Sequence, residues 1–393
     1  MGEKRQLERW FSVYELSYWA LVFITDGAYA SFLRCLGYGE AFIGKTLTML
    51  GLTSLILMPL GGFLADRIGQ YKVLTTFSAL LVCGTICLVQ IVPSKTMVFV
   101  YAVVGGGFTK LLAGFLDSWI TKISKEEPEL DYGRIRSMGS ISYAIASPLF
   151  GNLFSLLGYW TSIPLGILLF VVMLFCALKL RNPVLKDDRE EGPSFMEAIR
   201  YLFGNRTYMI FLGCSVLMNV TIQSFFAFVG VLVEDVGGTV GTLGIYYFIL
   251  ALFEFFVVRN YSKISGKLGL KKTVTLGMVG SFLKSFLHSL ATSVTGIYCA
   301  TVTQCVSLAI TVPSNAVYQR ECVEKKYLST ALLVMQTCCS GFVTFLLSST
   351  YGKVAEEYGT GMMLRLFSVF ALIAAVLFWF LAPKDDAQEV LNE

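Results

Sequence analysis

The sequence predicts an all-α polytopic membrane protein with about twelve transmembrane helices, arranged as two pseudo-symmetric bundles of six. Charged residues make up only 15% of its 393 residues and hydrophobic residues 55%, whereas a soluble protein carries about 25% charged residues. Apolar segments long enough to cross a bilayer recur along the chain. The second half also repeats features of the first half, which is typical of secondary transporters.

Twelve apolar segments and one charged break define the predicted domains. The segments of the first half cover residues 10–33, 43–65, 73–93, 97–121, 137–157 and 160–180. Those of the second half cover residues 207–233, 243–260, 273–290, 296–318, 328–350 and 362–382. We therefore expect an N-terminal bundle (1–180), a cytoplasmic linker (181–206), and a C-terminal bundle with a short cytoplasmic tail (207–393). The linker should end in a short amphipathic helix, because Phe195, Ile199, Leu202 and Phe203 form one apolar face.

Basic residues predict the orientation of the chain in the membrane. They concentrate on alternate loops, at Lys4, Arg5, Arg9, Arg67, Lys72, Lys122, Lys125, Arg134, Arg181, Lys186, Arg189, Lys263, Lys267, Lys271, Lys272, Arg320, Lys325, Lys326 and Lys384. Because cytoplasmic loops carry the excess of Lys and Arg, we expect both termini in the cytoplasm of a plasma-membrane protein. The first apolar segment is too long for the core of a cleavable signal peptide.

The composition argues against several other classes of protein. A formal net charge of +4 does not indicate nucleic-acid binding, and the ten cysteines form no CxxC pair. His288 is the only histidine, so no histidine-bearing metal cluster can form. We expect no enzyme activity, no cofactor and no metal. The expected partners are a small-molecule solute, protons and the lipid bilayer, and the chain should be a monomer.

An internal repeat relates the two halves. GGFLADRIGQYK (61–72) matches YSKISGKLGLKK (261–272), and Ile43-Gly44 matches Leu243-Gly244 at the same spacing. The second copy has Gly266 where the first has Asp66. Such repeats place a binding site between the halves in many secondary transporters.

The first copy of this repeat resembles the loop between the second and third helices of the major facilitator superfamily. Five residues match that signature, namely Gly62, Asp66, Arg67, Gly69 and Lys72. Gly69 permits a tight turn, and the charged pair can cap neighbouring helix ends. The resemblance implies that this motif controls the balance between the inward-facing and outward-facing states.

A second motif, LDYGRIRSMGSISYAIASPLFG (130–151), resembles the entrance to the fifth helix of the oligosaccharide:proton symporters, the lactose permease family. It is similar as well to the phenylpropionate-permease and nucleoside:proton symporter branches. The resemblance implies that Asp117 and Arg136 hold hydroxyl groups of the solute. It further implies that Tyr143 stacks on a ring of the solute and that Ala113 is the small residue before the acid.

The charge of Arg136 points to the same role. A charge inside a membrane normally faces a cavity and has a partner, which Asp117 would provide. The alternative is that Arg134 and Arg136 are both interfacial anchors that reach back to the cytoplasm.

The first apolar segment carries acids on one helical face. Glu15, Tyr18, Val22, Asp26 and Tyr29 share this face. We interpret it as a cavity wall, which adds Asp26 to the predicted substrate-binding residues. Glu15 could instead lie near the cytoplasmic interface, where a charge is inexpensive.

Proton coupling requires an acid that can gain and lose a proton. The helix-ten histidine and acid of the lactose permease family correspond to Gln304 and Ser307 here. Glu254 is the only acid within the apolar segments of the second half, and Lys284 on the next helix can supply its counter-charge. We therefore expect Glu254 to carry the proton. The alternatives are Asp26 as the carrier, or a static ion pair between Glu254 and Lys284.

These observations predict a proton-coupled uptake symporter for a small polar solute such as a sugar, a glycoside or a nucleoside. Two other functions stay open at this point. An efflux antiporter for amphipathic compounds would favour an apolar cavity, and a non-transporting membrane sensor would be expected to carry a further domain.

Overall fold

The computed structural model describes residues 2–127, 130–184 and 195–383, and within these ranges every regular element is a helix. The linker residues Lys186, Arg189 and Ser194 and the tail residue Lys384 lie outside the described residues, as do the side chains of Asp66 and Phe195. Contacts divide the chain into two compact units. The first unit comprises Met1–Asp187 with Val233–Phe248, and the second comprises Asp188–Leu232 with Ile249–Glu393.

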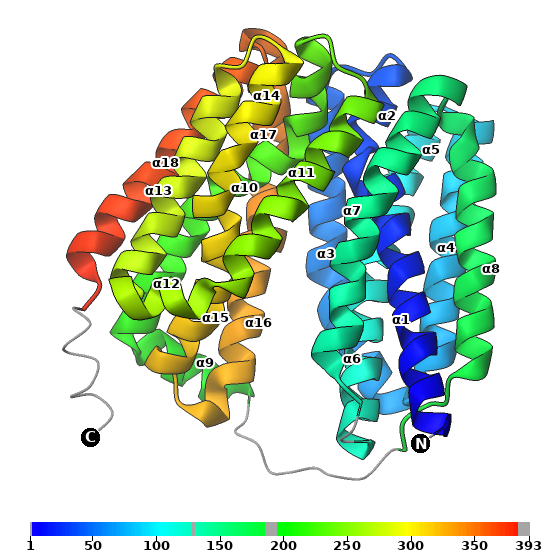
Figure 1. The fold of residues 1–393 in the computed structure, drawn as a ribbon, viewed down its shortest axis with the longest axis horizontal. Coiled ribbons are helices and arrows are strands. Elements are labelled where there is room, and N and C mark those ends of the chain that lie inside the picture. Colours follow the sequence, from blue (N-terminus) through cyan, green and yellow to red (C-terminus); the bar gives the residue numbers. More distant parts are fainter. Residues whose placement is uncertain (1, 128–129, 185–194, 384–393) are drawn as a thin grey trace. The chain divides into compact units, whose positions relative to one another are not determined.

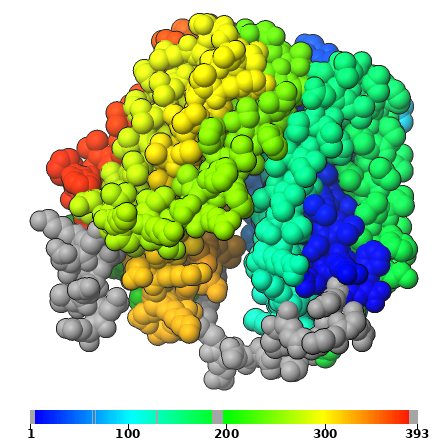
Figure 2. All heavy atoms as spheres, viewed as in Figure 1, coloured from blue at the N-terminus to red at the C-terminus, as the bar shows by residue number. Residues whose placement is uncertain are grey.

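The first unit contains the six apolar segments predicted for the N-terminal bundle, and its helices run roughly alongside one another (Figure 1). Its elements are α1 (Gly2–Val22), η1 (Phe23–Gly27), α2 (Tyr29–Cys35), α3 (Glu40–Ile68), α4 (Tyr71–Ile91), α5 (Lys95–Val100), η2 (Tyr101–Gly106), α6 (Gly107–Glu126), α7 (Tyr132–Leu157), η3 (Tyr159–Thr161) and α8 (Ser162–Lys179). Helix α1 packs mainly against α7 and α8, and part of it remains at the surface between them (Figure 2). The elements η1 and η2 are π-helical turns, a feature that often occurs at functional sites.

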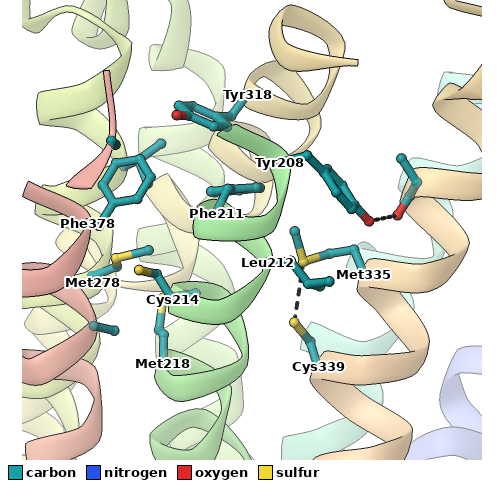
Figure 3. Packing of buried hydrophobic residues seen from close by; sticks show 14 of the residues in the cluster. Tyr208, Phe211, Leu212, Cys214, Met218, Met278, Tyr318, Met335, Cys339 and Phe378 are labelled. Carbon is teal, nitrogen blue, oxygen red and sulfur yellow. Dashed lines mark hydrogen bonds between the residues drawn. The ribbon is translucent and has the colours of Figure 1, made fainter. Parts of the chain in front are cut away.

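The second unit is built around α13. Its elements, two of which reach into the first unit, are α9 (Phe195–Gly204), α10 (Arg206–Asp235), α11 (Val240–Arg259), α12 (Tyr261–Leu268), α13 (Leu270–Ser289), α14 (Val294–Ala300), η4 (Thr301–Val306), α15 (Leu308–Cys322), η5 (Lys325–Tyr327), α16 (Leu328–Gln336), η6 (Thr337–Phe342), α17 (Val343–Tyr358) and α18 (Thr360–Leu381). Helix α13 packs against α18, α15 and η4. Figure 3 shows part of the core, where the Phe211 ring lies 4.4 Å from that of Tyr318, and Tyr208 donates a hydrogen bond of 2.8 Å to the Ala331 carbonyl.

Ten helical segments of the described chain are long and apolar enough to cross a membrane. The other two predicted positions are also helical, in α1 to α2 and in α13. These two segments are less apolar than the other ten because of their charged residues, which include Glu15 and Asp26 in the first and Lys272 and Lys284 in the second. Charges within a membrane helix normally face the protein interior, so these two helices are where functional groups are expected.

The predicted linker helix is present as α9. Ala198 and Leu202 are buried, and the Tyr201 ring stacks on Tyr327 at 4.3 Å. Glu197 accepts a 2.7 Å hydrogen bond from the Tyr327 hydroxyl group. Phe203, by contrast, is 66% exposed, so the apolar face of this helix is only partly covered by the second unit.

Six glycines of the described chain adopt positive φ, and they form three pairs. The pairs are Gly37 with Gly237 (82° and 84°), Gly69 with Gly269 (65° and 81°), and Gly158 with Gly359 (91° and 86°). The partners are 200, 200 and 201 residues apart (237 − 37, 269 − 69, 359 − 158). The internal repeat seen in the sequence therefore extends to the turns of the backbone.

Candidate functional site

Arg136 and Asp117 meet in the first unit, as the sequence predicted. Arg136 lies in the second turn of α7, a helix whose first turn is capped by Asp131. Its Nε atom is 3.7 Å from Oδ1 of Asp117 on α6, and Tyr132 donates a 3.3 Å hydrogen bond to the same oxygen. The arginine and aspartate side chains are 34% and 45% exposed. At 3.7 Å the two groups form an ion pair, and no hydrogen bond between them is present in the described chain.

The ring of Trp19 lies beneath the guanidinium of Arg136. The sequence did not predict this contact. The guanidinium carbon of Arg136 is 4.6 Å from the centroid of the Trp19 ring, a distance suited to a cation–π interaction. Gly139 gives the ring its room, because a Cβ there would be 2.3 Å from Trp19 Cδ1. The spacing of Arg136 and Gly139, three residues apart on one helix face, was the available signal.

Glu15 is buried beside the same tryptophan. It is 1% exposed, and it lies one helical turn before Trp19 on α1. This burial does not fit an acid at the aqueous interface. Arg134, two residues before Arg136, behaves as an interfacial anchor instead, because it is 69% exposed and pairs with Glu8 at 3.2 Å.

Asp26 belongs to a separate ion pair. Its carboxylate, in η1, contacts the ammonium group of Lys110 on α6, and the side chains are 23% and 40% exposed. Sequence reasoning found no cation near Asp26, because the two residues are 84 positions apart. The other carboxylate oxygen of Asp26 is buried and makes no hydrogen bond within the described chain.

Tyr143 lies in a cluster of aromatic rings. Its ring meets those of Trp19 at 6.2 Å, Phe23 at 6.1 Å and Tyr247 at 5.3 Å, each nearly edge-on. Ala113 is half-buried on α6, one turn before Asp117. The structure therefore places Tyr143 beside Trp19, the ring that lies under Arg136.

In the second unit, Gln304 stands between Glu254 and Lys284. Lys284 donates a 2.8 Å hydrogen bond to Gln304 Oε1, and Gln304 Nε2 donates a 3.2 Å hydrogen bond to Glu254 Oε2. The Lys284 ammonium also lies over the Phe225 and Phe226 rings, at 4.7 and 4.4 Å. In place of the direct ion pair left open by the sequence, the two charges are linked through a neutral amide.

The turn of the predicted gating motif has the expected backbone. Gly69 adopts φ 65° after α3, and its N–H donates to the Ala65 carbonyl at 2.9 Å. The backbone N–H of Lys72 donates a 2.9 Å hydrogen bond to Asn182, which also donates to Gln70 at 2.7 Å. The turn is thereby joined to the first residues after α8.

The other residues of the motif are less constrained by packing. A Cβ at Gly62 would meet open space, whereas one at Gly61 would lie 2.3 Å from Leu111. The close approach of α3 to α6 therefore depends on Gly61, which lies just before the matching residues. Arg67 is exposed in the last turn of α3, and the side chain of Asp66 lies outside the described residues.

The family model of the Major Facilitator Superfamily matches residues 15–348, which is most of the chain. The chain belongs to the major facilitator superfamily. It is a multi-pass membrane protein of that superfamily, and its helical architecture is the major facilitator fold.

Two curated proteins are similar to this major facilitator transporter in sequence. A maltose permease of Geobacillus stearothermophilus is 22% identical over 260 residues, which is 65% of this chain and 64% of the relative. The uncharacterized transporter YwbF of Bacillus subtilis (strain 168) is 20% identical over 273 residues, 68% of this chain and 66% of the relative. The match thus spans slightly less than two thirds of each relative.

Two solved structures share the major facilitator fold of this chain. The crystal structure of the nucleoside transporter NupG aligns with a TM-score of 0.80 at 18% identity, covering 96% of this chain and 98% of NupG. A bacterial homolog of the human lysosomal transporter Spinster, in an inward-facing and unoccupied conformation, aligns with a TM-score of 0.74 at 13% identity. That alignment covers 100% of this chain and 98% of the homolog.

Proposed function

We propose that this major facilitator protein is a proton-coupled symporter that imports a small polar solute, a sugar, a glycoside or a nucleoside. The observation that carries the proposal is the partly exposed Arg136–Asp117 pair above the Trp19 ring. Its donors, its acceptors and the neighbouring ring faces suit a solute that has hydroxyl groups around a ring. The similarity to a maltose permease and to a nucleoside transporter supports this class of solute.

The solute would bind by entering between the two charges. Arg136 is 3.7 Å from Asp117 at Nε, beyond hydrogen-bond distance, so its N–H groups could donate to solute oxygens. Asp117 and the Tyr132 hydroxyl can accept or donate in turn. Tyr143, beside Trp19, would supply a second ring face, and Ala113 would leave room above Asp117. Asp26, paired with Lys110, would contribute to a further part of the same cavity wall.

Glu254 is the proposed carrier of the transported proton, with Lys284 as its counter-charge. The contact that supports this role is the neutral Gln304 amide between them. Because Glu254 accepts from an amide rather than an ammonium, it can take up a proton without breaking a direct ion pair. Transport would follow from alternating access of two six-helix halves around a midplane site.

The remaining parts of the proposal concern gating and orientation. The motif of Gly62, Asp66, Arg67, Gly69 and Lys72 would set the balance between the two access states. Both termini would lie in the cytoplasm, and a single chain would suffice for transport. The alternative function is an efflux antiporter, which experiment can distinguish from an importer.

The proposal is tested by uptake of labelled maltose, a labelled aryl glucoside and labelled uridine into cells that express the protein, with and without a protonophore. We expect one of these solutes to accumulate, and the protonophore to abolish the accumulation. Arg136→Ala should lose the uptake, whereas Arg134→Ala, the matched change at the more exposed arginine, should retain it. A lower cellular content of the solute on expression would indicate efflux, and accumulation that ignores the protonophore would refute proton coupling.

A further inference from the structure

Glu15 is the one buried carboxylate among the described residues, with 1% of the residue exposed. Its Oε2 atom makes no hydrogen bond with any of these residues. A buried charge normally needs pairing and full hydrogen bonding, because its desolvation is expensive. Oε2 is therefore placed to hold a proton.

Glu15 and Asp117 share a single cation, the guanidinium of Arg136. Arg136 of α7 is the cation that acts on Glu15, and Asp117 of α6 is the like charge. Arg136 forms an ion pair with Asp117, at 3.7 Å, and lies over the ring of Trp19. If both acids were ionised, a single guanidinium would have to balance two negative charges.

The other elements packed against α1 do not supply a second cation to Glu15. From α8, the ammonium of Lys179 lies over the Phe175 ring at 5.5 Å. From η1, Asp26 is already paired with Lys110. The remaining titratable groups near Glu15 are the phenols of Tyr132 and Tyr18.

We propose that Glu15 binds a proton on Oε2 and that this proton releases Arg136 for the solute, so that solute binding takes up a proton in the first unit. With Glu15 ionised, its charge draws the guanidinium toward α1. With Glu15 neutral, Arg136 has one carboxylate partner and can direct its free donors to a solute beside Asp117. The inference rests on the proposed function, and gives Glu15 a role distinct from that of Glu254: it positions Arg136 and links binding to pH.

Thermodynamic linkage makes the inference measurable. If protonated Glu15 favours the solute, the solute must favour protonated Glu15 by the same factor. The Kd should then rise with pH by up to about tenfold per pH unit over the range in which Glu15 ionises. This expectation concerns equilibrium binding and does not depend on transport.

The experiment measures equilibrium binding of labelled maltose and labelled uridine to the purified full-length protein, from about pH 5 to about pH 9, a range in which buried carboxyl groups of proteins can titrate. Glu15→Gln should bind with the low-pH affinity at every pH, and Glu15→Asp should restore a slope. Glu8→Gln is the matched control on α1, since Glu8 pairs with the interfacial Arg134, and it should keep the wild-type slope. Glu254→Gln should keep it too, while losing accumulation. A wild-type slope in Glu15→Gln, or a flat wild-type profile, overturns the inference.

A solute-independent measurement separates this inference from the proposed function. Trp19 lies one helical turn after Glu15 on α1 and under the Arg136 guanidinium, so the fluorescence difference between wild type and Trp19→Phe should show a pH transition without solute. The transition should vanish in Glu15→Gln and remain in Glu8→Gln. If it is present while neither maltose nor uridine binds, the proton site stands and the solute class of the proposed function fails. If it is absent while a solute binds, the proton site fails and the proposed function stands.

Discussion

Replacing Gly139 by alanine would place a methyl group where the Trp19 ring now lies. The new Cβ would be 2.3 Å from Trp19 Cδ1 and 3.0 Å from Arg136 Nη1. Ordinary contact begins at 3.4 Å, so the ring and the methyl group must separate by 1.1 Å (3.4 − 2.3). The ring cannot move that far and keep its place under the guanidinium of Arg136, whose carbon is 4.6 Å from the ring centroid.

The size of the effect follows from two opposing contributions. Overpacking costs up to about 3 kcal/mol, whereas glycine to alanine inside a helix gains about 1 kcal/mol. We therefore expect Gly139→Ala to lose about 2 kcal/mol, either as stability or as solute affinity, and in affinity this is about 30-fold. Gly84→Ala on α4 is the matched control, because a Cβ there meets open space, and it should be neutral or slightly stabilising.

The assay combines thermal unfolding, followed by a thiol-reactive dye that reports the buried cysteines, with equilibrium binding of the solute. Trp19→Ala should remove the penalty, so the double variant Trp19→Ala/Gly139→Ala should be no worse than Trp19→Ala alone. A Gly139→Ala protein with wild-type stability and wild-type affinity would refute the packing of Arg136, Trp19 and Gly139 described here.

The remaining predictions concern Arg136, the proton carrier and the topology. Arg136→Lys should lower solute affinity about tenfold or more, which is about 1.4 kcal/mol, because an ammonium lacks the planar donors and the flat face that covers Trp19. Arg134→Lys should be close to wild type. Equal solute affinity in the two variants would indicate that both arginines are interfacial. Glu254→Gln should abolish protonophore-sensitive accumulation but keep exchange of solute down its gradient, since the amide mimics the protonated acid; a variant that still concentrates solute would transfer the carrier role to Asp26. Cysteines introduced at Met196 and Glu356, both exposed, should be labelled from opposite sides of the membrane by an impermeant maleimide, and labelling from one side would contradict the orientation.

The helices of this protein could be predicted from the sequence because each needs only a local signal. An apolar run of about twenty residues indicates a membrane helix without reference to the rest of the chain. The turn at Gly69 was equally local, since glycine alone accepts positive φ without strain. The pair of Arg136 and Asp117 was found by resemblance and by the need of a membrane charge for a partner.

The parts of the site that were missed depend on contacts between distant segments. Lys110 reaches Asp26 across 84 residues, and Gln304 reaches Glu254 across 50. Trp19 is one of many aromatic residues in a chain that is 14% aromatic, so its type carried no signal. Only the packing of α1 against α7 shows that this ring lies under the arginine.

The three pairs of positive-φ glycines separate what the two copies of the repeat must share from what they need not share. A side chain at these positions would strain the backbone by about 1–2 kcal/mol, so both copies keep glycine at Gly37 and Gly237 and at the two later pairs. The charged residues follow no such rule, because Asp66 has Gly266 as its counterpart. The two copies of the repeat thus have the same turns but different charged residues. Short turns should be interchangeable between the two copies, whereas charged residues should not, because the copies carry different residues at positions such as Asp66 and Gly266.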